Sequence, residues 1–326
     1  MNDNKKLLKE RAIEILKHKV IIIVSTLCSF TLGIFLLKNP FKFYFLNEKE
    51  IYILIEFVIS LILIIYSILP PKSKFKLDHI TGIILCMVFS LSICMLLFTK
   101  TRFYQLYLFL ITQSIFHYTE YISVITYHFD TIEFKSYLIN HSTEWIICLI
   151  ISYCETILGN IFFYDYKHNP YIFYSGIIIT IIGQIFRIGA LFNGKKNFTH
   201  LLSYEKKPEQ FLMTTGFYGI SRHPSYFGFW IWGFGTQLMC GNLICSIGFP
   251  IGLYMFFQDR IIEEEGLLIE FFGEAYLDYK KKVPILIPFI HMSKDEEQEH
   301  LSEYYNNHPE IIKVGKIKKK VERKIF

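Results

Sequence analysis

The sequence has little charge for its length and lacks the common catalytic signatures. Only 19% of its 326 residues are charged, whereas 52% are hydrophobic and 17% are aromatic. Soluble domains usually carry about 25% charged residues, so the composition favours an integral membrane protein. No zinc-protease, P-loop, nucleophile-elbow or dinucleotide-binding motif is present, so those enzyme classes have no support from motifs.

Cysteine spacing that would indicate a metal site or a disulfide framework is also missing. The seven cysteines show no CxxC spacing and no paired extracellular pattern. All of them lie in or beside apolar segments: Cys28, Cys86, Cys94, Cys148, Cys154, Cys240 and Cys245. We therefore favour small buried thiols within helices over a metal or redox site.

Two His-x-x-Glu pairs are the remaining candidates for metal ligands. They are His117 with Glu120 and His141 with Glu144. A carboxylate-bridged metal pair uses the reverse order, Glu-x-x-His, and needs further carboxylates that the sequence does not supply. Interhelical hydrogen bonding is the favoured role, and no metal site is predicted.

Long apolar runs are what the sequence has in abundance. A helix needs about 20 apolar residues to cross a hydrocarbon layer of ~30 Å. Candidate spans lie at 20–37, 51–69, 81–98, 103–127, 144–163, 171–192, 226–239 and 243–258. The first run is too long for a cleaved signal peptide. The predicted fold is an all-α polytopic membrane protein with about eight transmembrane helices, of which the last two form a short hairpin.

The distribution of Lys and Arg predicts the orientation of these spans. With a cytosolic N terminus, the cytosolic face receives the basic N-terminal residues, the loop 195–222 and the tail 313–324. Both termini are therefore expected in the cytosol. The tail accounts for much of the net charge of +5. A basic tail could bind nucleic acid, but beside so many spans an anionic membrane surface is the better partner.

Hydrophilic residues are concentrated on both sides of the last two spans. The segments 193–225 and 259–288 both fall on the predicted cytosolic face. We therefore expect one cofactor pocket that faces the cytosol at the C-terminal end. The chain divides into accessory helices at 1–170, a catalytic core at 171–290 and a charged tail at 291–326. Because that tail is charged and aperiodic, we expect it to be mobile.

The stretch Ser221 to Gly235 places charged and polar residues at the start of an apolar helix. Pro224 suits the first helical turn, and a helix that begins there directs its free N–H groups and its dipole toward the pocket. Such a terminus attracts an anionic group, for example a carboxylate. His223 and Tyr226 would stand beside the same opening. The alternative is an interfacial anchor, with a snorkelling Arg and aromatic residues at the membrane boundary.

A second cluster of ionisable residues follows the last span. On a helix, Arg260 lies one turn from both Glu263 and Glu264. This could be a solvated ion pair, but ionisable groups near a bilayer are costly and tend to mark functional sites. The segment 267–282 suits a helix that lies on the membrane surface. Arg187, near the cytosolic end of another span, could either snorkel or take part in the site.

From Arg187 to about residue 290, the sequence resembles the isoprenylcysteine carboxyl methyltransferases. The likeness rests on the combination of RHPSYFG, GTQLMCGN and FFGEAYLDYKKKVP. The shorter pattern RHPxY also occurs in membrane phospholipid methyltransferases and sterol reductases. The resemblance implies a membrane enzyme of the endoplasmic reticulum. Such an enzyme methylates the carboxylate of a C-terminal prenylcysteine on a processed CaaX protein, with S-adenosylmethionine as the donor.

The resemblance also assigns roles to individual residues. Those implied to contact S-adenosylmethionine are Ser203, Gln210, Phe211, Leu212, Met213, Tyr218, His223, Pro224, Ser225, Tyr226 and Glu264. Arg260 falls on the position that meets the acceptor. Arg187 is a second candidate catalytic residue, not from the resemblance but because it places a charge in an apolar span. The implied partners are prenylated CaaX proteins and membrane lipid, without nucleic acid. Neither the oligomeric state nor the preferred prenyl chain is predicted.

This chemistry agrees with the missing catalytic motifs. An α-carboxylate has a pKa of about 3.5 and is ionised at neutral pH, so methyl transfer to it needs no general base. The reaction needs the carboxylate oxygen in line with the sulfonium methyl, with water excluded. Arg260 could hold the carboxylate, while Tyr218 and Tyr226 could face the sulfonium and Glu264 could bind cofactor donors.

The alternative function is a membrane phospholipid N-methyltransferase. Its acceptor is a neutral amine, which gives less reason for Arg260 beside the site. A sterol reductase would need NADPH, and a transporter would move its substrate without methylating it.

Overall fold

The structure is a computed structural model that describes residues 76–309 apart from 99–100, 129–130, 133, 140–141, 168, 199–201, 203 and 207. The predicted spans at 20–37 and 51–69, His141, Ser203 and the basic tail at 313–324 lie outside the described residues.

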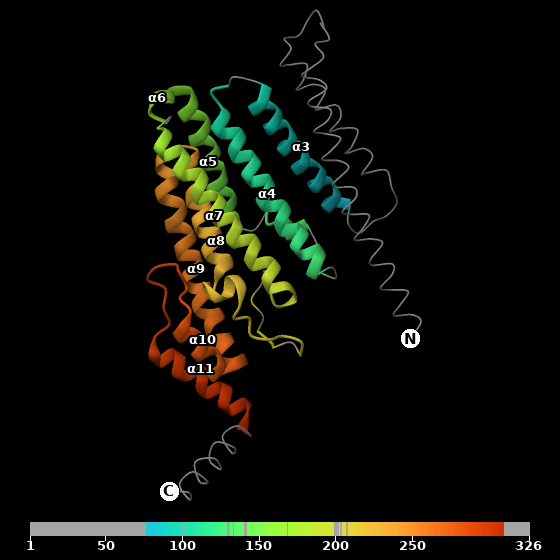
Figure 1. Cartoon of the computed structure of the whole chain (residues 1–326), viewed down its shortest axis with the longest axis vertical. Coiled ribbons are helices and arrows are strands. Elements are labelled where there is room, and N and C mark those ends of the chain that lie inside the picture. The colour runs from blue at the N-terminus through green and yellow to red at the C-terminus, as the bar shows by residue number, and fades with distance from the viewer. Residues whose placement is uncertain are drawn as a thin grey trace, which may run out of the picture. The chain divides into compact units, whose positions relative to one another are not determined.

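Every regular element in the described part of the chain is a helix (Figure 1), which confirms the all-α prediction. The α-helices are α3 (Lys76–Phe98), α4 (Tyr104–Tyr127), α5 (Thr143–Phe162), α6 (Tyr164–Lys167), α7 (Pro170–Gly194), α8 (Pro224–Met239), α9 (Leu243–Phe272), α10 (Glu274–Lys282) and α11 (Lys294–Asn307). Short 3-10 helices occur at η2 (Phe134–Tyr137), η3 (Lys195–Asn197) and η4 (Gly216–Gly219).

The predicted spans that fall in the described residues correspond to α3, α4, α5, α7, α8 and the first part of α9. Two segments, Thr143–Phe162 and Pro170–Asn197, are long and apolar enough to cross a membrane by length and composition. Their exposed residues are largely Ile, Leu and Phe, the composition expected of a surface that faces lipid.

The described helices belong to two compact units. One comprises Met1–Ile179 with Gly235–Ser246, and the other comprises Thr180–Phe234 with Ile247–Phe326. In the first unit, Lys167 Nζ donates hydrogen bonds to the backbone oxygen of Glu155 at 3.0 Å and to Asn242 Oδ1 at 2.9 Å. The Glu155 carboxylate accepts from the N–H groups of Ile244 and Cys245 at 2.8 and 2.9 Å. The bonds to the Glu155 carboxylate cap the start of α9, and the bond from Lys167 gives Asn242, in the turn after α8, a buried partner.

Two further sequence expectations concern the first unit. His117 Nδ1 lies 2.8 Å from the backbone oxygen of Tyr137 in η2, so its partner is a short 3-10 helix rather than a long neighbouring helix. The cysteines that the structure describes are free thiols: Cys86, Cys148, Cys154, Cys240 and Cys245. Cys154 is exposed on α5, which departs from the expectation of buried thiols.

Two glycines allow close packing of α7 against α8 in the second unit. A Cβ atom added to Gly183 would lie 2.5 Å from the backbone nitrogen of Trp232. A Cβ atom added to Gly228 would lie 2.5 Å from the backbone nitrogen of Arg187. Both distances are too short for a side chain, so the two helices approach through their backbones. This contact places Arg187 against the first turns of α8.

The last apolar helix is longer than predicted. It begins at Leu243 as expected but continues past Gln258 to Phe272, a length of 30 residues. The prediction of a short hairpin was therefore wrong for α9, although α8 has only 16 residues. Apolarity ends near Gln258, but Glu, Arg, Leu and Ile in the following turns continue the helix.

Gly273 ends α9 and divides the predicted surface helix. Its φ of +55° is in the left-handed region, which glycine adopts at helix ends without steric cost. The segment 267–282 is consequently not one helix, because it forms the last turns of α9 and then α10.

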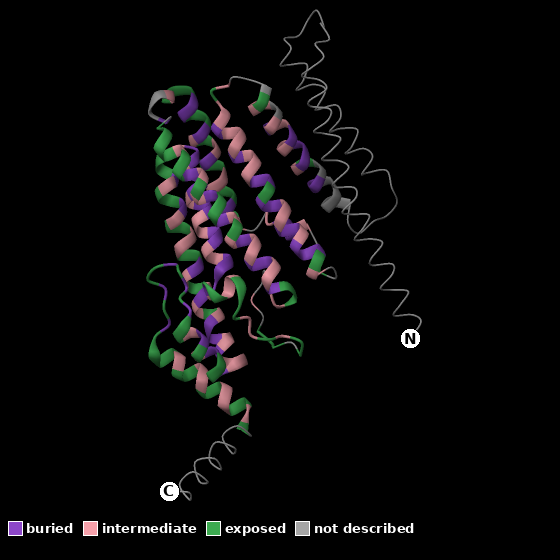
Figure 2. Ribbon diagram, in the orientation of Figure 1, coloured by how far each residue is buried: buried purple, intermediate pink, exposed green. Residues whose placement is uncertain are grey.

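The predicted mobile tail is also wrong in part, because residues 294–307 form α11. Ser293 and Glu296 form a capping box in which Ser293 Oγ accepts from the Glu296 N–H at 3.2 Å, and Glu296 Oε2 accepts from the Ser293 N–H at 2.8 Å. Leu301 packs against the cluster that contains Ile269 and Tyr276. The burial of α9 and α10 where they meet α11 can be followed in Figure 2.

Candidate active site

A pocket in the second unit brings together the predicted cofactor residues. Its empty space, including the part open to solvent, is about 920 Å³. Its walls include Gln210, Phe211, Leu212, Met213, Tyr218, His223, Pro224, Ser225, Tyr226 and Glu264. Ser203 lies outside the described residues. The structure thus gathers the remaining predicted residues around one cavity.

One wall of the pocket was not anticipated from the sequence. It is formed by residues of α9 and α10: Leu267, Leu268, Phe271, Phe272, Tyr276 and Tyr279. Leu268, Phe271 and Phe272 follow Glu264 at i+4, i+7 and i+8, so they share its helix face. This periodicity is a sequence signal for a wall shared with Glu264, but the apolar pairs and basic end of 267–282 led instead to the prediction of a helix on the membrane surface.

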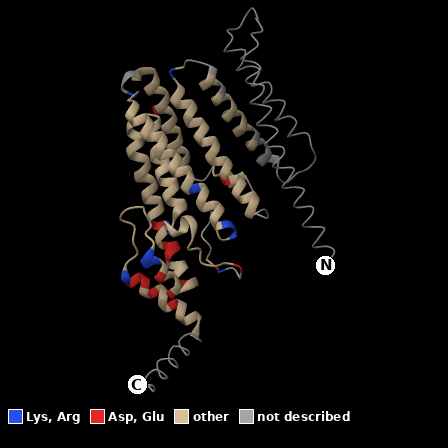
Figure 3. Ribbon diagram, in the orientation of Figure 1, with Lys and Arg blue, Asp and Glu red and all other residues tan. Residues whose placement is uncertain are grey.

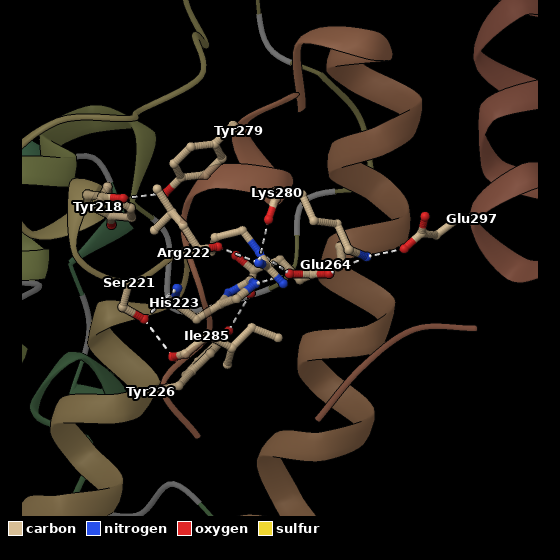
Figure 4. Close-up of polar contacts among 12 residues, drawn as sticks. Tyr218, Ser221, Arg222, His223, Tyr226, Glu264, Tyr279, Lys280, Ile285 and Glu297 are labelled. Carbon is tan, nitrogen blue, oxygen red and sulfur yellow. Dashed lines mark hydrogen bonds and ion pairs between the residues drawn. The ribbon is translucent and has the colours of Figure 1, made fainter. Parts of the chain in front are cut away.

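The turn before α8 is fixed by bonds to the chain that follows α10. Ser221 Oγ donates to the backbone oxygen of Ile285 at 2.6 Å, and the Arg222 N–H donates to the backbone oxygen of Pro284 at 2.9 Å. Tyr279 Oη donates to the backbone oxygen of Tyr218 at 2.5 Å. Figure 4 shows Ser221, Arg222 and Ile285 beside His223, with the bond between Tyr279 and Tyr218 to one side. The pocket edge is therefore built from two segments that are distant in the sequence.

Helix α8 begins at Pro224, as predicted. Both Pro224 and Ser225 line the pocket, so the first turn of this helix is at the cavity wall. The positive end of the helix dipole and the unpaired N–H groups of the first turn favour an anionic ligand group there.

Glu265 is the central buried charge of the site, and the sequence analysis missed it. Its side chain is 1% exposed. Its Oε1 atom lies 2.7 Å from Arg222 Nε and 3.2 Å from His223 Nε2, while its Oε2 atom lies 2.8 Å from Lys280 Nζ. Three consecutive glutamates on a helix point about 100° apart, so they cannot all face solvent. The sequence therefore indicates that one of the three carboxylates faces inward, but the resemblance assigned a role only to Glu264.

The environment of Glu265 keeps this carboxylate ionised. Burial by itself would raise the pKa of Glu265. The hydrogen bond and charge of His223, with the charge of Arg222, outweigh burial and hold the pKa well below its usual range. Glu265 is therefore an anion at neutral pH whose function is to hold its neighbours in place.

A hydrogen-bonded chain joins the predicted acceptor residue to a predicted cofactor residue. Arg260 Nε donates to Tyr226 Oη at 2.9 Å, and Tyr226 Oη donates to Glu264 Oε2 at 2.7 Å. The Arg260 guanidinium carbon also lies 5.8 Å from the Tyr226 ring centre, within cation–π range. Arg260 is not among the described residues that line the pocket. Its connection to the pocket is the hydrogen bond that it donates to the hydroxyl of the pocket residue Tyr226.

Arg187 is buried inside the protein, with 4% of its surface exposed, so the snorkelling interpretation is wrong. Its Nη1 atom donates to Ser225 Oγ at 2.5 Å, and its guanidinium carbon lies 5.3 Å from the Phe229 ring centre. Arg187 therefore contacts the pocket residue Ser225 but is not itself among the residues that line the cavity.

Charged residues of the second unit are concentrated in its C-terminal helices. Figure 3 shows the acidic and basic segments on the end of α9, on α10 and on α11. Among the described residues, no group of His, Cys, Asp and Glu side chains is arranged to hold a metal ion. The cavity combines an apolar wall, a helix start suited to an anion and the Glu264 carboxylate, so it fits a ligand with apolar, anionic and cationic parts.

The sequence that forms this site is similar to known proteins. The family model of the isoprenylcysteine carboxyl methyltransferase (ICMT) family matches residues 176–270. The protein-S-isoprenylcysteine O-methyltransferase of Mus musculus is 36% identical over 231 residues, which are 71% of this chain and 80% of that protein. The chain belongs to the ICMT family. The enzyme of the same name from Dictyostelium discoideum is 43% identical over 176 residues, covering 54% of this chain and 74% of that protein.

A solved structure supports the same assignment. It is described as the eukaryotic intramembrane Ras methyltransferase ICMT, and it matches with a TM-score of 0.73 and 28% identity over 82% of this chain and 96% of that one. The resemblance identified from the sequence motifs is thereby confirmed. The ICMT family match contains Arg187, Arg260 and Glu265 but ends before Lys280 and α11.

Proposed function

We propose that this chain transfers a methyl group from S-adenosylmethionine to the carboxylate of a C-terminal prenylcysteine on processed CaaX proteins. Membership of the ICMT family supports the reaction class. The observation that carries the proposal is the chain from Arg260 through Tyr226 to Glu264. It links a cation suited to a carboxylate acceptor with a carboxylate in the wall of the pocket.

The pocket residues fit S-adenosylmethionine by their chemistry. The start of α8 at Pro224 suits the carboxylate of the cofactor, and Glu264 suits its hydrogen-bond donors. The faces of Tyr218 and Tyr226 suit a sulfonium cation, and the Leu and Phe side chains of α9 suit an apolar ring. When bound, the cofactor supplies a methyl group activated by a positively charged sulfur.

The residues of the chain have the tasks of binding, alignment and exclusion of water. The acceptor carboxylate is ionised at neutral pH, so no proton has to be removed from it. An oxygen lone pair forms the new C–O bond while the C–S bond breaks and its electron pair stays on sulfur. Arg260 is proposed to hold the carboxylate, and the Tyr226 hydroxyl fixes the direction of its guanidinium. Arg187 and Ser203 remain proposed contributors.

The same proposal includes location and topology. We place the enzyme in the endoplasmic reticulum membrane, with about eight spans and both termini in the cytosol. The residues at 171–290 would form the catalytic core and the pocket would open to the cytosol. The apolar α5 and α7 and the charged α9–α11 region support this arrangement.

The test is a radiolabelled methyl-transfer assay on purified membranes that contain the full chain. We expect label in a minimal farnesylcysteine acceptor, and none in the same cysteine derivative without its prenyl group. Incorporation into phosphatidylethanolamine instead would favour the phospholipid N-methyltransferase. Absence of label in every acceptor, with folded protein that receives both substrates, would refute the proposal.

A further inference from the structure

Helix α11 lies beyond the family match, yet it contacts the elements that build the cofactor pocket. Glu297 Oε1 lies 2.8 Å from Lys280 Nζ of α10. His300 Nδ1 lies 2.6 Å from Glu270 Oε1, and Tyr305 Oη donates to Glu274 Oε1 at 2.9 Å. These polar contacts hold α11 along the end of α9 and the start of α10.

The contact made by Glu297 differs from the others because it leads to the pocket wall. Lys280 Nζ lies 2.8 Å from Glu297 Oε1 and also 2.8 Å from Oε2 of the buried Glu265. The other oxygen of Glu265 binds Arg222 and His223, both of which line the pocket. Figure 4 shows Lys280 between Glu297 and the Arg222 region. A continuous chain of charged groups thus runs from α11 to the cavity.

We propose that Lys280 and Glu297 are positioning residues for S-adenosylmethionine, which act on the pocket through the buried carboxylate of Glu265. The inference rests on the proposed function. It extends the cofactor site to α11, which the family match does not include.

The charges in this cluster give the proposal a specific direction. Arg222 and Lys280 supply two cations, and Glu265 and Glu297 supply two carboxylates, so these four groups sum to zero, while His223, which also contacts Glu265, is the same in every variant. Removing the charge of Glu297 therefore makes the cluster behind the pocket wall one unit more positive. Buried and half-buried charges are weakly screened, so a surplus cation there opposes the binding of a positively charged ligand.

The cofactor and its product form a natural pair of probes. S-adenosylmethionine carries a sulfonium charge, whereas S-adenosylhomocysteine has a neutral thioether at the same atom. An electrostatic role for Glu297 therefore changes the ratio of the two affinities. A purely structural role of α11 would weaken both ligands by the same factor and leave the ratio unchanged.

The experiment compares Glu297→Gln with His300→Gln in the full-length protein. Glu297→Gln removes the charge from one contact between α11 and its neighbours, and His300→Gln removes the imidazole from another, but only Glu297 connects through Lys280 to Glu265. Dissociation constants for the two ligands are measured by calorimetry, and unfolding temperatures are recorded for each variant. For Glu297→Gln we expect S-adenosylmethionine to bind about two- to fivefold more weakly, as for loss of a partly exposed ion pair, with a smaller change for S-adenosylhomocysteine. For His300→Gln we expect a lower unfolding temperature and an unchanged affinity ratio.

A second variant keeps the proposal testable if Glu297→Gln does not fold. Lys280→Gln removes one positive charge from the same cluster, so the affinity ratio should move in the opposite direction, in favour of S-adenosylmethionine. An unchanged ratio in the variant that folds, or the same shift in His300→Gln, would overturn the inference. Failure of the unmodified protein to bind S-adenosylmethionine would refute the proposed function itself, which is a separate outcome.

Discussion

Removal of one hydroxyl group tests the proposed link between the acceptor residue Arg260 and the cofactor residue Glu264. Tyr226 Oη accepts from Arg260 Nε at 2.9 Å and donates to Glu264 Oε2 at 2.7 Å. Tyr226→Phe deletes both bonds but keeps the ring, which lies 4.9 Å from Phe257 and 5.7 Å from His223 between ring centres. The substitution therefore separates hydrogen bonding from packing.

The expected size of the effect follows from the two bonds. A hydrogen bond to a charged group is worth about 1.5–3 kcal/mol when it is shielded from water. Both bonds are only partly buried, so water can replace part of each. We therefore expect a total loss of about 1.5–3 kcal/mol, which corresponds to about a 10- to 100-fold lower kcat/KM.

The assay measures methyl transfer from labelled S-adenosylmethionine to farnesylcysteine, with each substrate varied in turn. Cofactor affinity is measured in parallel by calorimetry. Tyr305→Phe is the matched control, because Tyr305 also donates its hydroxyl to a carboxylate, that of Glu274 at 2.9 Å, and is not among the pocket-lining residues. The control should retain kcat/KM within about twofold.

The reasoning fails if Tyr226→Phe keeps full kcat/KM for both substrates. It also fails if the loss equals that of Tyr305→Phe, because the hydroxyl would then have no special connection to the chemistry. A loss confined to the unfolding temperature would reduce Tyr226 to a packing residue.

Substitutions at three further positions test separate parts of the site. Arg260→Ala should raise the KM of the acceptor or lower kcat by about 10-fold or more. Arg260→Lys should be only partly active, because lysine lacks the forked geometry of the guanidinium. Unchanged kinetics at limiting acceptor would make Arg260 a surface ion pair. His223→Ala should weaken S-adenosylmethionine binding in calorimetry by about 10-fold, and equal affinity would remove it from the cofactor site. The pKa of Glu265 is held below the ordinary glutamate value of 4.5, so the stabilisation that its ionised form gives is complete above that pH and is lost as pH falls toward the folded-state pKa. The unfolding temperature should therefore drop on acidification below about pH 5, and this drop should be shallower in Glu265→Gln.

The sequence predicted the helical fold and most helix starts because apolar runs and Pro224 are strong local signals. It did not predict where α9 ends, because hydropathy shows where a helix stops being apolar enough for lipid and not where the helix itself stops. The helix continues as long as its residues favour it, and Gly273, with a φ of +55°, ends it. Helix α11 was not predicted, because the charged and aperiodic sequence of the tail indicated a mobile segment. The local signal for its start is the capping box formed by Ser293 and Glu296.

The pocket walls were predictable to the extent that motifs marked them. His223, Tyr226 and Glu264 were identified through the family resemblance, and the structure places them around one cavity. Glu265 was not identified, because adjacent positions on a helix differ in burial and only packing decides which one faces inward. The hydrogen bond between Arg260 and Tyr226 could not be predicted either, because it joins residues of two helices whose packing the sequence does not show.

The close contact of Gly228 with the backbone of Arg187 has a consequence for how variants of this protein should be interpreted. A methyl group at position 228 would meet the Arg187 nitrogen at 2.5 Å, so the helices would have to separate. That separation would pull the guanidinium away from Ser225 at the cavity wall. An alanine in an uncharged, lipid-like stretch could thus impair methyl-donor binding although every polar residue of the site is intact.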